Sequence, residues 1–477
     1  MGSKWGGRYK YAKACTYHEL GETINSTHPT SSLVSPMSTR EIQRVAICGG
    51  GLGGLTLAAV LNQNSDIHVD IYEAKPSIAS LGAGIAIWKR TWEVFQELGL
   101  EEEMAKRKLR LPQEGEIRGP TFRKGDQPED GFDFHSHMMP YGPTAIARPI
   151  LLEILQARLS DKTNIYTSKR LLEYRTDTDT AEPIELVFDD GSTGRADIVI
   201  GADGVHSMTR AKMYRLLESA DQEAGSYDKF IDPIWSGTYA YRAQVDLVKF
   251  KEKYPDHKAL DNPRIWLGKN KHVVSHPLGN IIHLVCYHTV DTGEGTPYDG
   301  PWVKNVLPEE VIDTYEGWEP NLHLEKPSRW AIHVIRPIPL SVFGRVGLLG
   351  DAAHAMTPHQ GVGGGQAIEF IRRKDAYILG HLLAYPKANL QTIDEVLRVY
   401  QEIRLPFAAK AAERSRENGL IYEFIHPDYP VKPDATAEDL KVLGNVIRAS
   451  FEWLAQGGCN EDRKRAEDLL SARLAGN

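Results

Sequence analysis

Three glycines after a short apolar run are the first residues whose spacing indicates chemistry. Gly49, Gly51 and Gly54 form the pattern GxGxxG directly after the strand-like residues 45–48. Because these positions lack side chains, the backbone can turn tightly and bring its N–H groups and a helix N-terminus against a pyrophosphate. Glu73 ends the next predicted strand, where a carboxylate can accept hydrogen bonds from both hydroxyls of an adenosine ribose. A glycine-rich turn beside a surface glutamate is the alternative, but it leaves that placement unexplained, so we predict a dinucleotide site.

Two later segments distinguish one dinucleotide from another. Residues 201–207 read GADGVHS, and residues 350–358 read GDAAHAMTP. Together with the glycine motif, and in this order, they resemble the three fingerprints of the class A flavoprotein monooxygenases, the group that contains p-hydroxybenzoate and salicylate hydroxylases. Each segment alone is compatible with an ordinary strand-end turn or a helix cap. The combination extends over about residues 44–405 and implies that FAD, rather than NAD, is the bound cofactor.

The resemblance gives FAD-binding roles to three polar residues. Asp351 stands where the family's aspartate binds the ribityl chain of FAD, a task suited to a short carboxylate at a strand end. Asp203 matches the aspartate of the family's DG motif, which is associated with FAD and with the passage of NAD(P)H. Arg148 matches an arginine near the FAD phosphates, whose negative charge it would offset. A solvated arginine at the start of a helix is the alternative for Arg148.

Two glycine loops match the segments that surround the flavin ring. Residues 361–365, which include Gly364, match the loop whose N–H groups approach the pyrimidine edge, and that edge becomes anionic on reduction. Gly84 ends residues 82–84, which match the loop over which the isoalloxazine moves. Residues 88–90 read WKR where many members of the family have a Pro-Asn pair. This departure concerns the mobility of the flavin and leaves the identity of the cofactor unchanged.

The resemblance implies an enzyme, an FAD-dependent monooxygenase. In this family NADPH or NADH reduces the flavin, O₂ forms a C4a-hydroperoxyflavin, and one oxygen atom is added to a small phenolic or salicylate-like aromatic substrate. Some fungal members dearomatise a polyketide phenol by the same chemistry. Two other functions remain open: a flavin dehydrogenase or oxidase that inserts no oxygen, and a non-enzymatic binding protein on the same fold. A second GxGxxG motif is missing, which disfavours the dehydrogenase, and the intact Glu73, Asp203 and Asp351 disfavour the binding protein.

Arg242, His272 and His276 are the candidate catalytic residues, and all lie in a β-favouring region. The dipeptide Tyr241-Arg242 resembles the Tyr/Trp-Arg pair of salicylate-hydroxylase-like proteins, and Arg242 would place a cation beside a phenolate or carboxylate. His272 and His276 are four residues apart on a predicted strand and therefore share a face. A histidine there can take a phenol proton at neutral pH. An ion pair between domains and a pair of structural histidines are the alternatives.

Tyr141, Tyr239 and Tyr241 are the candidate substrate-binding residues. Tyr239 and Tyr241 share one face of a predicted strand, and Tyr141 precedes Arg148 in the chain. We therefore expect these three rings to line the substrate pocket. His354 belongs to the third fingerprint, and we interpret it as a structural residue.

The elements that must position these residues predict an α/β fold. A strand, a helix and a second strand around the glycine motif indicate a Rossmann-like FAD-binding domain, which we assign to residues 40–212 and 335–410. β-favouring stretches separated by turns indicate an inserted substrate domain with a mixed β-sheet over residues 213–334. Helical spacing of apolar residues predicts a C-terminal helical segment over residues 411–477. Residues 1–39 show no periodicity, and we predict a disordered extension there.

Composition disfavours several other classes of protein and partner. The chain of 477 residues is 41% hydrophobic and 25% charged, as in an ordinary globular protein. A net charge of −8 without a basic run disfavours nucleic acid as a partner, and no apolar run is long enough to span a membrane. Four cysteines without metal-binding spacing predict neither a disulfide framework nor a metal site, which fits a cytoplasmic protein. The expected partners are a small aromatic substrate and O₂, and the expected state is a monomer or homodimer.

Overall fold

The computed structural model describes most of the chain after the predicted extension. The described residues are 40–78, 84–129, 131–139, 141–142, 144–176, 182–220, 226–260, 262–319, 326–360 and 372–476. Three sequence-based predictions lie wholly or partly outside these ranges: the disordered extension at residues 1–39, the start of the 82–84 loop, and the glycine loop 361–365 with Gly364.

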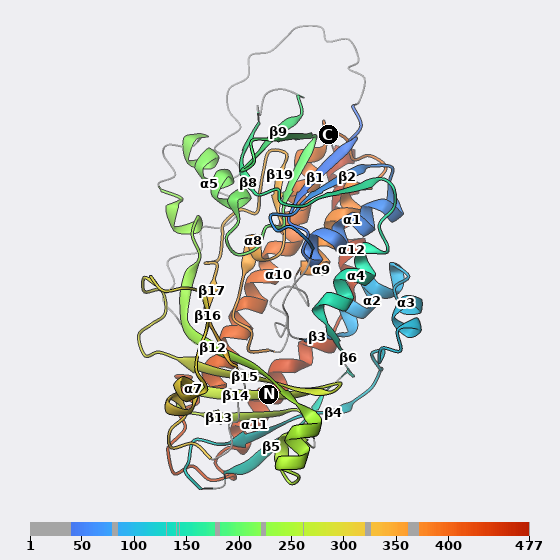
Figure 1. The fold of residues 1–477 in the computed structure, drawn as a ribbon. Coiled ribbons are helices and arrows are strands. Elements are labelled where there is room, and N and C mark those ends of the chain that lie inside the picture. The colour runs from blue at the N-terminus through green and yellow to red at the C-terminus, as the bar shows by residue number, and fades with distance from the viewer. Residues whose placement is uncertain are drawn as a thin grey trace, which may run out of the picture. The chain divides into compact units, whose positions relative to one another are not determined.

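A six-stranded sheet positions the glycine motif (Figure 1). Its order is β18-β19-β11-β1-β2-β7, and the central strand β1 pairs in parallel with both β2 and β11. Val45, Ile47, Val69 and Ile71 are fully buried, because both faces of a parallel sheet are normally covered. The strands are β1 Arg44–Cys48, β2 His68–Tyr72, β7 Thr163–Tyr166, β11 Ile198–Gly201, β18 Val342–Phe343 and β19 Val346–Leu348.

Helices cover one face of this sheet, and a three-stranded meander covers the other. Leu55 and Leu379 belong to the hydrophobic core that the helices share with the sheet. The meander, in the order β10-β9-β8, contributes Leu186 and Phe188 to a second core together with Ala46. The elements of these two layers are α1 Leu52–Asn64, α4 Arg148–Gln156, α9 Arg372–Leu383, α10 Ile393–Tyr422, α12 Cys459–Gly476, β8 Leu171–Arg175, β9 Ile184–Phe188 and β10 Thr193–Ala196.

A second sheet of eight strands occupies the lower part of Figure 1, in the order β16-β17-β12-β15-β14-β13-β4-β5. Neighbouring strands are antiparallel except β13 and β4, which are parallel. The sheet therefore includes two strands that precede residue 213, where the sequence places the start of the substrate domain. The strands are β4 Ile117–Lys124, β5 Phe132–Met139, β12 Ile234–Asp246, β13 Arg264–Gly268, β14 Lys271–Leu278, β15 Ile281–Thr289, β16 Val303–Asn305 and β17 Ser328–Val334.

Side-chain alternation gives the eight-stranded sheet two different faces. On one face, Tyr241 and Val273 form a core with Val311 of helix α7. On the other face, Ile265 packs in a core with residues of the C-terminal helices, including Tyr422. We call this second side the helix-covered face. The helices concerned are α6 Leu247–Lys253, α7 Pro308–Thr314 and α11 Lys441–Glu452, besides α10.

The remaining elements are short. They are β3 Gly84–Ile87, β6 Thr144–Ala147, α2 Lys89–Glu97, α3 Glu101–Lys106, α5 Met208–Ala220, α8 Asp351–His354 and the 3₁₀ turns Asp228–Phe230, Lys258–Leu260 and Trp453–Ala455. Within the described residues, none of the helices combines the length and the apolar character that crossing a membrane requires. The predicted α/β class, with a Rossmann-like sheet, a mixed β-sheet and C-terminal helices, is confirmed.

Candidate active site

The glycine turn between β1 and α1 is built around two close backbone approaches. Gly49 has φ of 115°, a value that residues with a Cβ rarely adopt. A Cβ at Gly49 would lie 2.2 Å from the carbonyl oxygen of Ala202, and one at Gly54 would lie 2.2 Å from that of Gly49. Gly51 differs, because no heavy atom lies within 4 Å of the place where its Cβ would stand. The N-terminus of α1 is therefore open on this side, as the pyrophosphate of a dinucleotide requires.

The Glu73 carboxylate is fixed beside this turn. Its Oε2 accepts a hydrogen bond from the backbone N–H of Gly50 at 2.9 Å, and its Oε1 accepts one from Lys75 N–H at 2.9 Å. Each carboxylate oxygen can accept more than one hydrogen bond, so both remain able to receive a ribose hydroxyl. The glycine turn and Glu73 thus provide a cradle that fits an adenosine diphosphate group.

The second fingerprint is held in shape by Asp203. Its carboxylate accepts hydrogen bonds from the Ser207 hydroxyl at 2.5 Å and from the Thr209 N–H at 3.0 Å, and so caps the start of α5. Arg210, which sequence reasoning missed, is 1% exposed and donates to the backbone carbonyls of Val205, Ile231 and Ala352. Since Ala352 belongs to the third fingerprint, Arg210 links the second fingerprint to the third. A buried arginine bound only to carbonyl groups leaves no motif that a single sequence could reveal.

The third fingerprint is held by a buried ion network beneath α8. Asp351 is the first residue of α8, and the preceding Gly350 has φ of 68°. Asp375, 1% exposed, accepts hydrogen bonds from His354 Nε2 at 2.6 Å and from Arg404 Nε at 2.8 Å. Burial acts to raise the pKa of Asp375, but the charges of His354 and Arg404 outweigh it and keep this pKa below its usual range. The structure places His354 in this network, which agrees with its structural interpretation.

Replacing Asp375 by asparagine is expected to lower the free energy of unfolding by about 3 kcal/mol, because the buried Arg404 loses its compensating charge. Urea unfolding at neutral pH measures this change. In wild-type protein, the stabilisation that Asp375 provides should disappear as the pH falls below the ordinary pKa of aspartate, because the pKa of Asp375 is depressed in the folded state. Asp190→Asn, at a surface ion pair with Lys169, is the control and should leave the free energy of unfolding nearly unchanged. Equal effects of the two substitutions would contradict the network.

Arg148 lies close enough to both Glu73 and Arg242 for their charges to affect its pKa. It begins α4 directly after β6, where Ala147 pairs with Gly84. Its Nε atom is buried without a hydrogen-bond partner, and it forms no salt bridge within the described residues. Burial first, and then the positive charge of Arg242, lower the pKa of Arg148 to about 10, while Glu73 acts in the opposite direction. A half-buried cation whose charge interacts with Glu73 fits the phosphates of a dinucleotide better than it fits a solvated helix start.

Arg242 lies on the helix-covered face of the eight-stranded sheet. Its guanidinium carbon lies 4.4 Å from the centroid of the Trp330 ring, a cation–π contact. Burial lowers the pKa of Arg242, its Nε atom has no hydrogen-bond partner, and the described residues supply no carboxylate to it. The alternative role for Arg242, an interdomain ion pair, therefore has no acidic partner in the described part of the chain. A half-buried guanidinium without a counter-ion is suited to an anionic ligand.

The two predicted catalytic histidines share the face of Arg242 but have different surroundings. The His272 ring is fully buried, stacks on the Tyr287 ring at 4.4 Å, and places Nδ1 3.0 Å from Glu423 Oε1. Burial lowers the pKa of His272 to about 3. His276 pairs across the strands with His283, whose pKa burial lowers to about 4, with Arg242 adding to the effect. His272 is thus part of a buried cluster, whereas His276 lies opposite His283, whose pKa responds to the charge of Arg242.

The predicted substrate-binding tyrosines do not gather around Arg242. Tyr241 points to the opposite face of β12, where its hydroxyl lies 3.3 Å from Glu310 Oε1. Tyr239 shares that face and carries the Arg329 guanidinium 4.6 Å above its ring. The reason is the period of a strand, since neighbours such as Tyr241 and Arg242 point to opposite sides. Tyr141 is 4% exposed, and burial raises its pKa to about 12.

His359 is a functional candidate that sequence reasoning missed. It follows the third fingerprint, is 7% exposed, and lies with its ring 5.2 Å from that of Tyr287 on the helix-covered face. A Cβ at Gly419 of α10 would lie 2.5 Å from the His359 ring, so this glycine leaves the space that the ring occupies. Burial lowers the pKa of His359 to about 3, and its Nδ1 has no hydrogen-bond partner. The signal available in the sequence was its position directly before the glycine loop.

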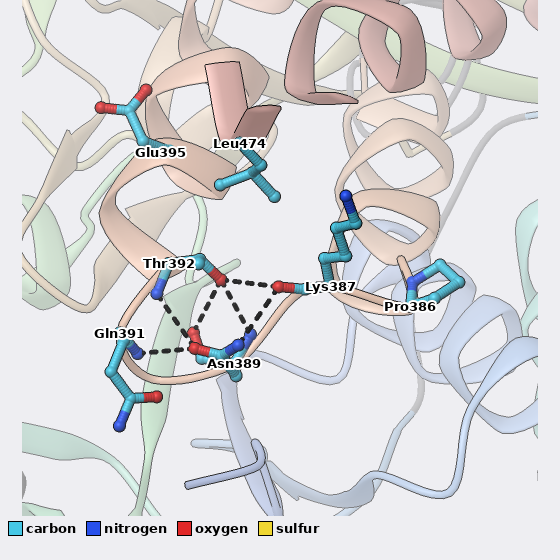
Figure 2. Close-up of a pocket in the computed structure, with 7 residues that line it drawn as sticks. All are labelled: Pro386, Lys387, Asn389, Gln391, Thr392, Glu395 and Leu474. Atoms are coloured by element: carbon cyan, nitrogen blue, oxygen red, sulfur yellow. Dashed lines mark hydrogen bonds between the residues drawn. The ribbon is translucent and has the colours of Figure 1, made fainter. Parts of the chain in front are cut away.

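A pocket of about 520 Å³ lies elsewhere, at the turn between α9 and α10 (Figure 2). The turn's polar groups bond to one another: Asn389 Oδ1 accepts from Gln391 N–H at 2.9 Å, and the Thr392 hydroxyl donates to Lys387 O at 2.9 Å. None of the predicted site residues lines it. The arrangement explains how α10 begins and does not indicate a binding function.

Comparisons with known proteins agree with this geometry. A family model described as FAD binding domain matches residues 43–276 and 281–415. The salicylate hydroxylase of Pseudomonas putida is 31% identical over 424 residues, which cover 86% of this chain and 91% of that protein. A 6-methylsalicylate 1-monooxygenase of Aspergillus terreus is 32% identical over 387 residues, covering 78% and 81%. A solved salicylate hydroxylase substrate complex superposes with a TM-score of 0.73 at 28% identity, covering 89% of this chain and 98% of that one.

Proposed function

The chain belongs to the FAD-dependent aromatic monooxygenases, the family of salicylate hydroxylase, and on this premise we propose its substrate class. The substrate is a small aromatic acid with a phenol beside the carboxylate, and the reductant is NADPH or NADH. The single observation that supports this choice is Arg242, a half-buried cation without a carboxylate partner among the described residues. Salicylate, the substrate named for one relative, carries the complementary anion next to a phenol.

The residues around the glycine turn fit FAD. The open N-terminus of α1 at Gly51 and the cation of Arg148 would hold the pyrophosphate, Glu73 the adenosine ribose, and Asp351 the ribityl chain. FAD, when bound and reduced, supplies the electrons and the activated oxygen atom. The protein must supply orientation, a dry pocket and control of protons.

Three side chains of the helix-covered face perform these tasks in our proposal. Arg242 binds the substrate carboxylate and fixes the ring, because charge-assisted hydrogen bonds from a guanidinium are directional. His359, neutral at physiological pH, accepts the phenol proton, and the resulting phenolate makes the ring carbon more nucleophilic. His276 contacts a ring substituent from its place opposite His283 on the same face. The buried Val285 and Ile332 on the same face exclude water.

Turnover under ¹⁸O₂ tests this function. FAD-loaded protein is mixed with NADPH or NADH and a panel of salicylates, resorcinols and phenolic aldehydes. We expect the salicylates to stimulate NAD(P)H oxidation most and one labelled oxygen atom to enter the product ring. Oxidised product without label would identify a dehydrogenase or oxidase, and colourless protein that binds no added FAD would identify a binding protein. The mass and ultraviolet spectrum of the product also distinguish aromatic hydroxylation from dearomatisation.

We also propose that the enzyme works in the cytoplasm as a monomer or homodimer and takes no nucleic acid partner. Among the described cysteines, Cys48, Cys286 and Cys459 are buried free thiols, which supports a reducing compartment. The negative net charge opposes binding to nucleic acid. Size-exclusion chromatography with light scattering gives the mass in solution, and any assembly larger than a dimer would contradict this part of the proposal.

A further inference from the structure

A buried cluster of proton-binding groups lies behind His359. Glu423 follows the last residue of α10, is 1% exposed, and contacts His272 Nδ1 through Oε1 at 3.0 Å. The His272 and His359 rings are 5.1 Å apart between centroids. His272 Nε2 and His359 Nδ1 are buried and have no hydrogen-bond partner in the described part of the chain. His359, His272 and Glu423 therefore lie one behind another, with a hydrogen bond between His272 and Glu423 and two adjacent imidazole rings whose facing sides are unpartnered.

The cluster contains one acid and no fixed cation. The groups that face Glu423 are His272 from β14, His359 from the loop after α8, Tyr287 and Thr289 from β15, and Tyr315 after α7. Among the described residues no lysine or arginine pairs with Glu423. Burial raises the pKa of Glu423 to about 7 and lowers those of both histidines. The carboxylate is thus the strongest base of the cluster, and a proton given to either imidazole is more stable on Glu423.

We propose that Glu423 is the final acceptor of the substrate's phenol proton, which reaches it through His359 and His272. The proposal rests on the proposed function, because it needs a phenol at His359. Glu423 acts through the histidines and does not touch the substrate. Its distance from the ring keeps the accepted proton away from the phenolate oxygen.

The proton transfer balances without any oxidant or reductant. The phenol O–H bond breaks as an N–H bond forms on His359. The His359 ring turns so that its Nδ1–H donates to His272 Nε2, where the N–H bond re-forms, and the His272 Nδ1 proton forms a new O–H bond on Glu423. Both histidines end neutral. The negative charge moves from Glu423 to the phenolate, where Arg242 can stabilise it. Because the net charge stays constant, the pocket takes no proton from solvent and releases none.

A proton inventory of ligand binding tests the relay. The probe is 2,4-dihydroxybenzoate, whose phenol and phenolate forms absorb differently, added to FAD-loaded protein without NAD(P)H. At about pH 8, above the pKa of Glu423, we expect phenolate absorbance without proton release, measured by calorimetry in buffers of different ionisation enthalpy. At about pH 6 Glu423 already holds a proton, so the phenolate signal should be lost. Release of a full proton per ligand at the higher pH in wild-type protein would overturn the proposal, and this measurement needs no variant.

Variants of the cluster separate a proton relay from mere packing. In Glu423→Gln the phenolate should either fail to form at about pH 8 or form with release of one proton per ligand, and Glu423→Asp should restore retention of the proton. His272→Phe should slow the appearance of phenolate in stopped flow by about tenfold or more. Glu417→Gln is the matched control, since Glu417 also lies on α10, has a raised pKa and is exposed away from the cluster. The relay would be rejected if Glu423→Gln showed the same phenolate absorbance and the same proton release as Glu417→Gln.

The relay and the proposed function fail in different ways. If wild-type protein adds labelled oxygen to a salicylate but releases a full proton when the probe binds, the relay is wrong and the proposed function stands. If wild-type protein neither binds the probe nor adds labelled oxygen to any phenolic acid, the proposed function is wrong, and the relay is rejected with it.

Discussion

Replacing Arg242 by methionine is expected to make the protein more stable and nearly inactive at the same time. The guanidinium is half-buried without a carboxylate partner in the described residues, so the Trp330 ring alone offsets its desolvation in the free enzyme. Removing it should raise the free energy of unfolding by about 1–3 kcal/mol. The substrate carboxylate loses its charge-assisted hydrogen bonds, so kcat/KM with salicylate should fall by roughly 10²–10³, equivalent to about 3–4 kcal/mol. Urea unfolding and steady-state kinetics measure the two effects.

Arg329→Met is the matched control for this prediction. Arg329 also lies over an aromatic ring, 4.6 Å from the Tyr239 centroid, but on the opposite face of the sheet and with Glu310 as an ion-pair partner at 3.0 Å. This substitution should lower stability and leave kcat/KM within about twofold of wild type. Arg242 would not be the substrate's anion site if Arg242→Met lost stability and kept its activity.

Substituting Gly51 by alanine should remove FAD binding while leaving the fold in place. Gly51 has an ordinary backbone conformation, with φ of −73°, and its Cβ would meet no protein atom within 4 Å. The cost to folding should be about 1 kcal/mol, from the loss of a favourable residue at the helix start. The new methyl group would occupy the space through which the pyrophosphate approaches α1, so the Kd for FAD should rise by roughly 100-fold. Flavin fluorescence titration of the apoprotein measures this affinity.

Gly49→Ala and Gly476→Ala are the two controls for that experiment. Gly49→Ala combines a φ of 115° with a contact of 2.2 Å to the Ala202 carbonyl oxygen, so it should destabilise the apoprotein by several kcal/mol, of order 3. Gly476 also has free space where a Cβ would stand, so Gly476→Ala should change neither the stability of the apoprotein nor its affinity for FAD. Unaltered FAD affinity in folded Gly51→Ala protein would show that the pyrophosphate does not approach the helix here.

The sequence predicted the cofactor cradle well because its chemistry depends on short spacings. Gly49, Gly54 and Glu73 lie within one βαβ unit, where a local pattern determines which atoms meet. His272 and His276 were placed on a common face by the period of a strand, and both lie in the single strand β14. The same period, applied to the dipeptide Tyr241-Arg242, would have separated its two side chains; the family resemblance led us to group them.

Contacts between distant segments were not predictable from one sequence. Arg210 binds the Ala352 carbonyl, and His272 binds Glu423, across separations of 142 and 151 residues. Buried polar groups of this kind have no periodicity and no motif, because their partners are defined only by the packing of the whole chain. His359 belongs to the same class, since its role depends on the space left by Gly419 and on the neighbouring Tyr287 ring. The sequence placed the start of the substrate domain at residue 213, although β4 lies earlier in the chain. β4 belongs to the eight-stranded sheet through its pairing with β13, which is another contact between distant segments.

The parallel pairing of β4 with β13 has a consequence for how the chain emerges from the ribosome. About 125 residues separate the end of β5 from the start of β13, so the β4–β5 hairpin must wait for its neighbour for roughly 6–25 s at ordinary synthesis rates. During that interval Phe122, which is fully buried in the finished protein, belongs to an isolated two-stranded hairpin of marginal stability. During much of its translation, the nascent chain therefore exposes apolar side chains of an incompletely paired sheet. Chaperone demand and insoluble expression should depend on this interval more than on the stability of the completed fold.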